Sequence, residues 1–143
     1  HEELFLSVGD AYGIPTVALR YFNAYGTRQS LSNPYTGVMA IFSSRLLNGH
    51  APLVFEDGGQ SRDFVHVSDI IAANLLAMQR EAAVGGVFNV GTGRATSVLE
   101  IGRLLARELG LAIEPEISGR FRAGDIRHRG CHGCVDAEAR PRG

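Results

Sequence analysis

One short stretch of the chain combines residue types that can bind a ligand. Residues 16–29 read TVALRYFNAYGTRQ, so a β-branched and apolar run leads into Tyr21, Phe22 and Asn23 before a glycine. A strand that only had to end could use Gly, Asp or Pro and would need no aromatic residues. In α/β folds, ligands bind beyond the carboxyl ends of parallel strands. The stretch therefore predicts one wall of a binding site; the alternative is a loop whose rings pack into the core.

The chain contains no lysine, so all 14 of its Lys-plus-Arg residues are arginine. Arg62 follows the Gly58-Gly59 turn at the start of an alternating run, so it can reach inward from a strand edge. A guanidinium there can bind a diphosphate through two parallel hydrogen bonds; a surface salt bridge is the alternative. Arg122 and Asp125 form a second polar pair, suited to an anion and a hydroxyl group. Proton transfer by a lysine is excluded within this chain.

Helices and strands that alternate along the chain would position these groups. Apolar residues at helical spacing predict helices, and short β-branched or aromatic runs predict strands. Ser97 followed by Glu100 has the pattern of a capping box, and Asp69 is predicted to be the N-cap of the helix that begins at Ile70. Helices are expected over 2–12, 38–48, 69–79 and 97–109, strands over 16–22, 53–56, 62–67, 87–90 and 113–117, and a loop over 23–37. This order is typical of an α/β fold.

The composition is that of an ordinary globular protein of 143 residues, with 45% hydrophobic and 20% charged residues. The net charge of −1 indicates no general surface for nucleic acid or anionic membranes. No apolar run approaches the ~20 residues of a membrane-spanning helix, and the polar start, His1-Glu2-Glu3, predicts no signal peptide. Both cysteines, Cys131 and Cys134, lie near the end of the chain. No disulfide framework is therefore expected, and a cytoplasmic location fits.

Four segments carry a resemblance to a known family. They read RYFNAYG at 20–26, QSRDFVHVSDI at 60–70, VFNVGTG at 87–93 and RAGDIRH at 122–128. Together they resemble the extended short-chain dehydrogenase/reductase family, in particular its NAD-dependent, UDP-glucose 4-epimerase-like nucleotide-sugar epimerases and dehydratases. The order and spacing of the segments match that family across roughly residues 1–128. Four motifs in register are far more specific than one.

The resemblance implies a fold and a division of the chain. It implies the carboxyl-terminal part of a Rossmann-type doubly wound sheet, together with a small α/β substrate-binding domain. Residues 1–30 would then end the dinucleotide-binding domain, and residues 31–128 would form the nucleotide-sugar-binding portion. Elements near 62–93 can return to the main sheet. Residues 129–143 are Arg-, Gly- and Cys-rich and are expected to be a disordered or aberrant tail.

The resemblance also implies roles for the candidate site residues. Tyr21 and Phe22 would form a wall around the nicotinamide ring of NAD, or else pack in the core. The other candidates would bind a nucleotide-diphosphate sugar. Asn23 would contact the sugar or the diphosphate, and Asn33 would contact the nucleotide sugar from a flexible loop. Val54 and Phe55 would line the nucleobase pocket. Arg62 and Arg122 would bind the diphosphate, and Asp125 would accept from a ribose or sugar hydroxyl. For Asn33 a turn with Pro34 is an equal alternative, and for Val54 and Phe55 it is a plain buried strand.

Two hallmarks of the family are not found in this sequence. No glycine-rich dinucleotide loop opens a strand–helix unit, and a Tyr-x-x-x-Lys pair cannot exist without lysine. We therefore expect a carboxyl-terminal part with no catalytic residue, no activity alone and NAD bound mostly by another part; the full enzyme is expected to be a homodimer. A non-catalytic nucleotide-sugar-binding module and a truncated gene product are the alternatives. The CHGC segment is too small a ligand set to predict a metal.

Overall fold

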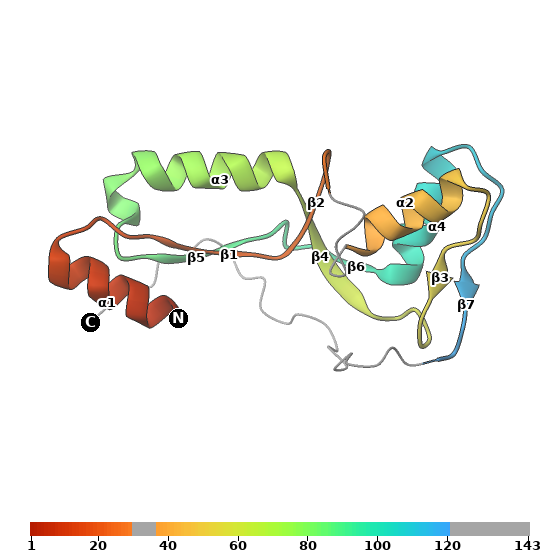
Figure 1. Ribbon diagram of the computed structural model, residues 1–143, viewed down its shortest axis with the longest axis horizontal. Helices are drawn as coiled ribbons and strands as arrows, with labels where there is room; N and C mark the ends of the chain where they lie inside the picture. The colour runs from red at the N-terminus through yellow and green to blue at the C-terminus, as the bar shows by residue number, and fades with distance from the viewer. Residues whose placement is uncertain (30–36, 121–143) are drawn as a thin grey trace.

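A computed structural model describes residues 1–29 and 37–120 of the protein (Figure 1). The tail expected at 129–143 lies outside these residues. Within them, helices and strands alternate along the chain, as expected. No helix of the described residues is long and apolar enough to cross a bilayer.

The first sheet is a parallel pair of strands with a helix on each side. β1 (Ala18–Tyr21) pairs with β5 (Val87–Val90), with Ala18 opposite Val87. In Figure 1, α1 (Glu2–Tyr12) and α3 (Val67–Gln79) lie on opposite sides of this pair. A short 3-10 helix, η1 (Glu81–Ala83), leads from α3 into β5. Helices on both faces of parallel strands are the layering of a doubly wound sheet, so the predicted α/β, Rossmann-type fold is confirmed.

The chain changes partner strand directly after β1. The backbone N–H of Phe22 still donates to the carbonyl of Val90, at 3.3 Å. Then β2 (Asn23–Tyr25) pairs in parallel with β4 (Ser61–His66), and β4 pairs in antiparallel with β6 (Ala95–Ser97). One continuous stretch of chain therefore joins two sheets, and Phe22 lies at the switch.

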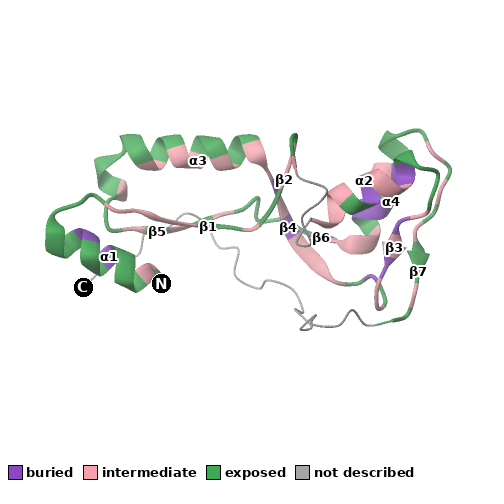
Figure 2. Cartoon of the chain, in the orientation of Figure 1, coloured by how far each residue is buried: buried purple, intermediate pink, exposed green. Residues whose placement is uncertain are grey.

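A smaller unit holds most of the buried apolar side chains. α2 (Val38–Leu47) and α4 (Val98–Glu108) pack together beside the parallel pair of β3 (Leu53–Val54) and β7 (Glu116–Ile117). Phe42, Val54 and Ile101 form its core. Gly102 matters here, because a Cβ at this position would lie 2.9 Å from Cγ of Pro115. Figure 2 shows this concentration of buried residues on α2 and α4.

Several boundaries differ from those that the sequence predicts. The loop expected over 23–37 contains β2, whose three residues form a strand because they pair with β4, which is distant in the sequence. α3 begins at Val67, two residues early, and its N-cap is His66, whose Nδ1 accepts from the N–H of Ser68 at 3.3 Å. The prediction that Asp69 caps this helix is therefore wrong. Ser97 does cap α4, accepting from the N–H of Glu100 at 3.1 Å.

Candidate functional site

A pocket of about 260 Å³ opens where β2 and β4 meet the start of α2. It lies beyond the carboxyl end of β1, the side on which parallel sheets bind ligands. Its walls combine aromatic rings, the side-chain amide of Asn23, which the sequence predicts as a ligand contact, and the first turn of α2. The lining residues are Phe22, Asn23, Ala24, Tyr25, Gln29, Gly37, Val38, Met39 and Phe64.

The register of β2 against β4 places two of these residues opposite each other. Asn23 pairs with Phe64, and both line the pocket. Asn23 is exposed, and no described residue forms a hydrogen bond with its side-chain amide. The amide can therefore donate to and accept from a ligand in this pocket. Two residues further along the same pair of strands, the rings of Tyr25 and His66 meet edge to face, with centroids 5.3 Å apart.

Arg62 lies on the same face of β4 as the pocket. Successive residues of a strand point to opposite faces, so Arg62 and Phe64 share one face, while Asp63 and Val65, both buried, share the other. The guanidinium of Arg62 is half-buried and donates from Nη1 to the carbonyl of Ser61 at 2.9 Å. Within the described residues it forms no salt bridge, so the surface ion pair that was its alternative is not seen there.

Tyr21 and Phe22 are neighbours in the chain but have different surroundings. The ring of Phe22 lines the pocket. The hydroxyl of Tyr21 instead donates to Oδ1 of Asn74 on α3 at 2.9 Å, and Tyr21 does not line the pocket. Of the two residues that the sequence assigns to the nicotinamide wall, the structure brings only Phe22 to the pocket, and the cofactor role of both stays a prediction.

Val54 and Phe55 lie in the smaller unit. Val54 is fully buried against Phe42 and Ile101, and its carbonyl accepts from the N–H of Ser118 at 2.9 Å. Phe55 follows β3 and is partly exposed. Neither lines the pocket, and their predicted role at a nucleobase stays untested. Asn33, Arg122 and Asp125 lie outside the described residues.

Two N–H groups of the glycine-containing loop after β5 are occupied. The carboxylate of Asp63 accepts from the N–H of Thr92 at 3.0 Å, from its hydroxyl at 2.6 Å and from the N–H of Gly93 at 2.9 Å. These N–H groups cannot at the same time hold a phosphate. The loop also lacks the G-x-G-x-x-G spacing of a dinucleotide-binding loop.

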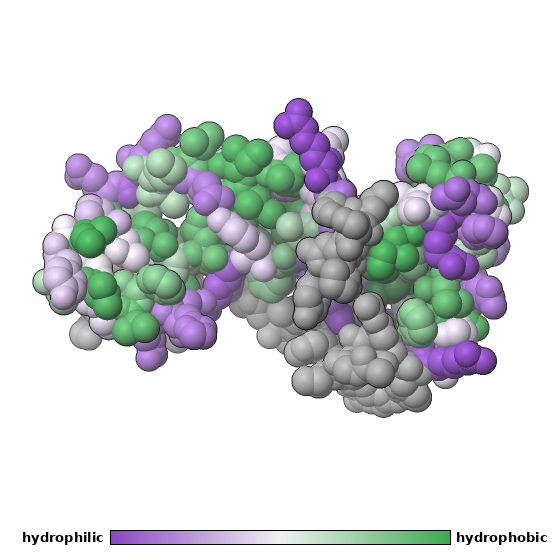
Figure 3. All heavy atoms as spheres, viewed as in Figure 1, coloured by the Kyte–Doolittle hydropathy of each residue, from purple (hydrophilic) through white to green (hydrophobic). Residues whose placement is uncertain are grey.

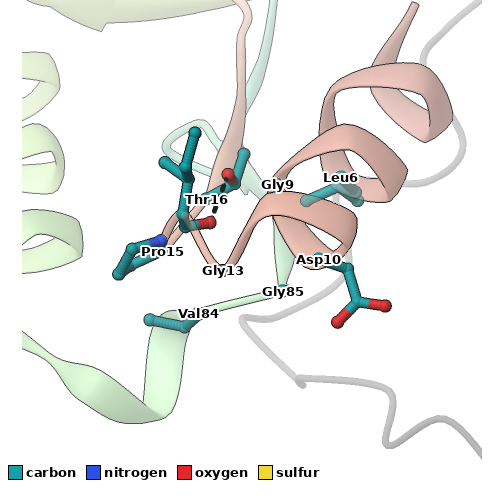
Figure 4. Close-up of a pocket in the computed structure, with 9 residues that line it drawn as sticks. Leu6, Gly9, Asp10, Gly13, Pro15, Thr16, Val84 and Gly85 are labelled. Carbon is teal, nitrogen blue, oxygen red and sulfur yellow. Dashed lines mark hydrogen bonds between the residues drawn. The ribbon is translucent and has the colours of Figure 1, made fainter.

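A second pocket, of about 270 Å³, lies at the other end of β1 (Figure 4). It is formed by the end of α1, the turn into β1 and the residues before β5, among them Leu6, Gly9, Thr16 and Val84. The hydroxyl of Thr16 donates to the carbonyl of Ile14 at 2.9 Å, so its donor is used. Among the described residues of this lining, Asp10 is the only ionisable one. Its place at the amino ends of the strands makes it the weaker candidate for a ligand site.

Sequence reasoning placed Tyr25 and Gln29 in the stretch predicted to form one wall of a site, but it missed Met39 and Phe64. Phe64 could have been found, because strand alternation places it on the face of Arg62. Met39 could not, since it joins the pocket only where the start of α2 meets β2 and β4. No cluster of three or more potential metal ligands occurs in residues 1–29 and 37–120.

Comparison with known proteins finds similar proteins in the family that the sequence motifs resemble. The family model for the NAD-dependent epimerase/dehydratase family matches residues 1–91. A dTDP-L-rhamnose 4-epimerase of Burkholderia thailandensis is 41% identical over 117 residues, which are 82% of this chain and 32% of the relative. A solved UDP-glucose 4-epimerase of Thermotoga maritima, with UDP-glucose, superposes with a TM-score of 0.79 and 40% identity, covering 88% of this chain and 40% of that one.

A UDP-N-acetylglucosamine 4-epimerase of Methanobrevibacter ruminantium, in complex with UDP-N-acetylmuramic acid, is similar to the same extent. It has a TM-score of 0.79 and 37% identity, over 87% of this chain and 39% of that chain. The chain thus spans about a third to two fifths of the length of these relatives. The family model covers well over half of this chain, and the structures superpose on nearly all of it. The chain belongs to the NAD-dependent epimerase/dehydratase family.

Proposed function

We propose that this chain is the carboxyl-terminal, substrate-binding part of an NAD-dependent nucleotide-sugar epimerase or dehydratase, inactive alone. The observation that carries the proposal is the pocket beyond β1, with the amide of Asn23, which has no partner among the described residues, in its wall and Arg62 on the same strand face as Phe64. A diphosphate taken out of water needs donors and positive charge in exchange for its hydration. Arg62 supplies both, and Asn23 supplies a donor.

The ligand class that fits is a nucleotide-diphosphate sugar. Arg62 lies two residues before Phe64, a distance of about 7 Å along a strand. That distance lets one extended ligand contact the guanidinium with its phosphates and the pocket with its sugar. The UDP-glucose held by the Thermotoga relative supports this class. Holding the sugar in one orientation is the chain's share of the catalysis, because positioning can supply a large part of a rate enhancement.

The described residues fit one end of NAD. The cofactor supplies hydride chemistry, taking a hydride from a sugar carbon and returning it. The ring of Phe22 in the pocket wall is a flat apolar surface suited to a nicotinamide. The loop after β5, however, donates the N–H groups of Thr92 and Gly93 to Asp63. The rest of the cofactor would therefore be held by residues other than those described, and residues 1–30 would complete a dinucleotide-binding domain.

The full enzyme is proposed to be a homodimer. α1 exposes Leu4, Phe5 and Tyr12, at 63, 67 and 77% of their surface. These large apolar side chains on one helix are what an interface would cover. Sedimentation of the full enzyme, which measures its oligomeric state, tests this proposal.

Calorimetric titration with UDP-glucose tests the proposed function. Arg62→Ala should weaken UDP-glucose binding about 10- to 100-fold, because a charge-assisted hydrogen bond is worth ~1.5–3 kcal/mol. Arg62→Lys should restore only part of the affinity, since a point charge cannot reproduce the guanidinium fork. The same titration with NAD should show no micromolar binding to this chain alone.

Arg103→Ala is the matched control. Arg103 lies on α4, is exposed, and pairs with Glu114 at 3.3 Å, away from the pocket. Its removal should leave UDP-glucose binding unchanged. Equal affinities of Arg62→Ala and the parent would contradict the assigned pocket, and micromolar NAD binding would contradict the division of labour.

A further inference from the structure

Asp63 is a buried carboxylate that the proposed substrate site does not use. Only 3% of its surface is exposed. It lies on the face of β4 opposite Arg62 and Phe64, and it accepts from the N–H and hydroxyl of Thr92 and from the N–H of Gly93. Hydrogen bonds to an ionised acceptor are stronger than those between neutral groups. The carboxylate therefore fixes the loop after β5 onto β4, across about thirty residues of sequence.

The carboxylate of Asp63 and the ring of Phe22 both lie against Gly91, the first residue of this loop. A Cβ built on Gly91 would be 2.5 Å from Oδ2 of Asp63 and 2.8 Å from Cδ2 of Phe22. The loop backbone at Gly91 is thus packed between the carboxylate and the Phe22 ring, without space for a side chain. The backbone N–H of Phe22 also donates to Val90, the last residue before this loop.

We propose that Asp63 is a positioning residue, which holds the 91–93 loop against Phe22 and thereby sets the ring that forms the pocket wall. The inference rests on the proposed function, because it assigns the ordered ring a task in ligand binding. Asp63 does not contact the ligand. Its removal should release the loop, give the ring of Phe22 room to rotate, and weaken binding without removing any ligand contact.

Asp63→Asn in the full 143-residue chain tests this role. The side-chain size is kept, but one oxygen becomes an NH2 group that faces N–H donors. We expect the ring resonances of Phe22, observed by NMR with labelled phenylalanine and assigned by Phe22→Leu, to shift and broaden without ligand. We expect the dissociation constant for UDP-glucose to rise about tenfold. A purely stabilising residue would change the unfolding midpoint and leave both of these readouts of the folded chain as they are.

Asp57→Asn is the matched control. Asp57 also accepts a backbone N–H, from Gly59 at 3.0 Å, but in an exposed turn. It should change neither the Phe22 resonances nor the affinity. Thr92→Val and Thr92→Ser provide a milder pair. The valine removes the hydroxyl that donates to Asp63 at similar size and should shift the Phe22 resonances, whereas the serine keeps the hydroxyl and should restore them.

The outcomes separate this inference from the proposed function. A parent chain that does not bind UDP-glucose contradicts the proposed function, and the Phe22 resonances still report on positioning. A parent that binds, with Asp63→Asn showing equal affinity and unchanged Phe22 resonances, overturns the positioning role. Should Asp63→Asn fail to fold, the threonine pair decides: unchanged resonances in Thr92→Val overturn the role, and shifted resonances that serine restores support it.

Discussion

The two ends of this molecule bury their apolar residues very differently. Around α2, α4 and β3, the side chains of Phe42, Leu46 and Val54 are at most 2% exposed. Around β1 and β5, α1 buries only Leu6 and Gly9, and α3 buries none of its residues. Figure 3 shows hydrophobic residues on the surface over α3, where Met78 is 84% exposed.

The difference indicates which region can hold its own structure. A folded unit needs enough buried apolar area to offset the conformational entropy of ordering the chain. The unit around Phe42 has such a core, whereas the β1–β5 pair with its two helices presents apolar faces without a cover among the described residues. The site lies at the boundary, since the pocket takes Val38 and Met39 from one region and Phe22 from the other.

The largest effect expected of a single substitution is in the smaller unit. Phe42→Ala removes a ring that packs against Val54 and Ile101, and the cavity should lower the free energy of unfolding by about 3–5 kcal/mol. Phe5→Ala, on exposed α1, is the matched change and should remain within about 0.5 kcal/mol of the parent. Urea denaturation followed by circular dichroism measures both. Similar losses for the two variants would contradict the contrast between the regions.

Hydrogen exchange should resolve the same contrast residue by residue. Amides of α4, which buries Ile101 and Ala106, are expected to exchange at least about tenfold more slowly than those of β1 and β5. The physical reason is that exchange requires local opening, and opening α4 exposes the unit's core. NMR-detected exchange at one pH provides the measurement. Equal protection of α4 and β1 would show that the chain opens as one cooperative unit.

The sequence predicts the regular elements well because their signals are local. α1 and β5 have the predicted bounds, and Ser97 caps α4, since periodicity and capping depend on neighbouring residues. β2 escapes prediction because Asn23–Tyr25 is a strand only through its pairing with β4. The cap of α3 is missed because Asp69 was expected to cap the helix, whereas His66, three residues earlier, does so.

The site is predictable only in part for the same reason. Asn23 and Phe22 follow from their place after a strand, and strand alternation could have added Phe64 to Arg62. The contact between Asp63 and the 91–93 loop joins segments about thirty residues apart, so no local pattern reveals it. The hydrogen bond from Tyr21 to Asn74 likewise joins β1 to a helix about fifty residues later, and no local pattern reveals it.

The smallest expected effect concerns the ion pair that ties α1 to β1. Arg20 donates from Nε to Glu2 at 2.7 Å and from Nη2 at 2.5 Å, and these hydrogen bonds lower the pKa of Glu2 below its usual value of about 4.3. A lowered folded-state pKa means that the stabilisation is present above about pH 4.3 and is lost as the pH falls through the folded pKa. Because both side chains are well exposed, solvent screening should keep the effect on unfolding near the limit of detection.

The sharper measurement of this ion pair is an NMR titration of the Glu2 carboxylate. Arg20→Gln should raise the midpoint of that titration, whereas Arg107→Gln, whose partner is Glu108, should not. An unchanged Glu2 midpoint in Arg20→Gln would mean that the pair does not hold α1 against β1 in solution, and that this region is looser still than its exposed apolar faces indicate.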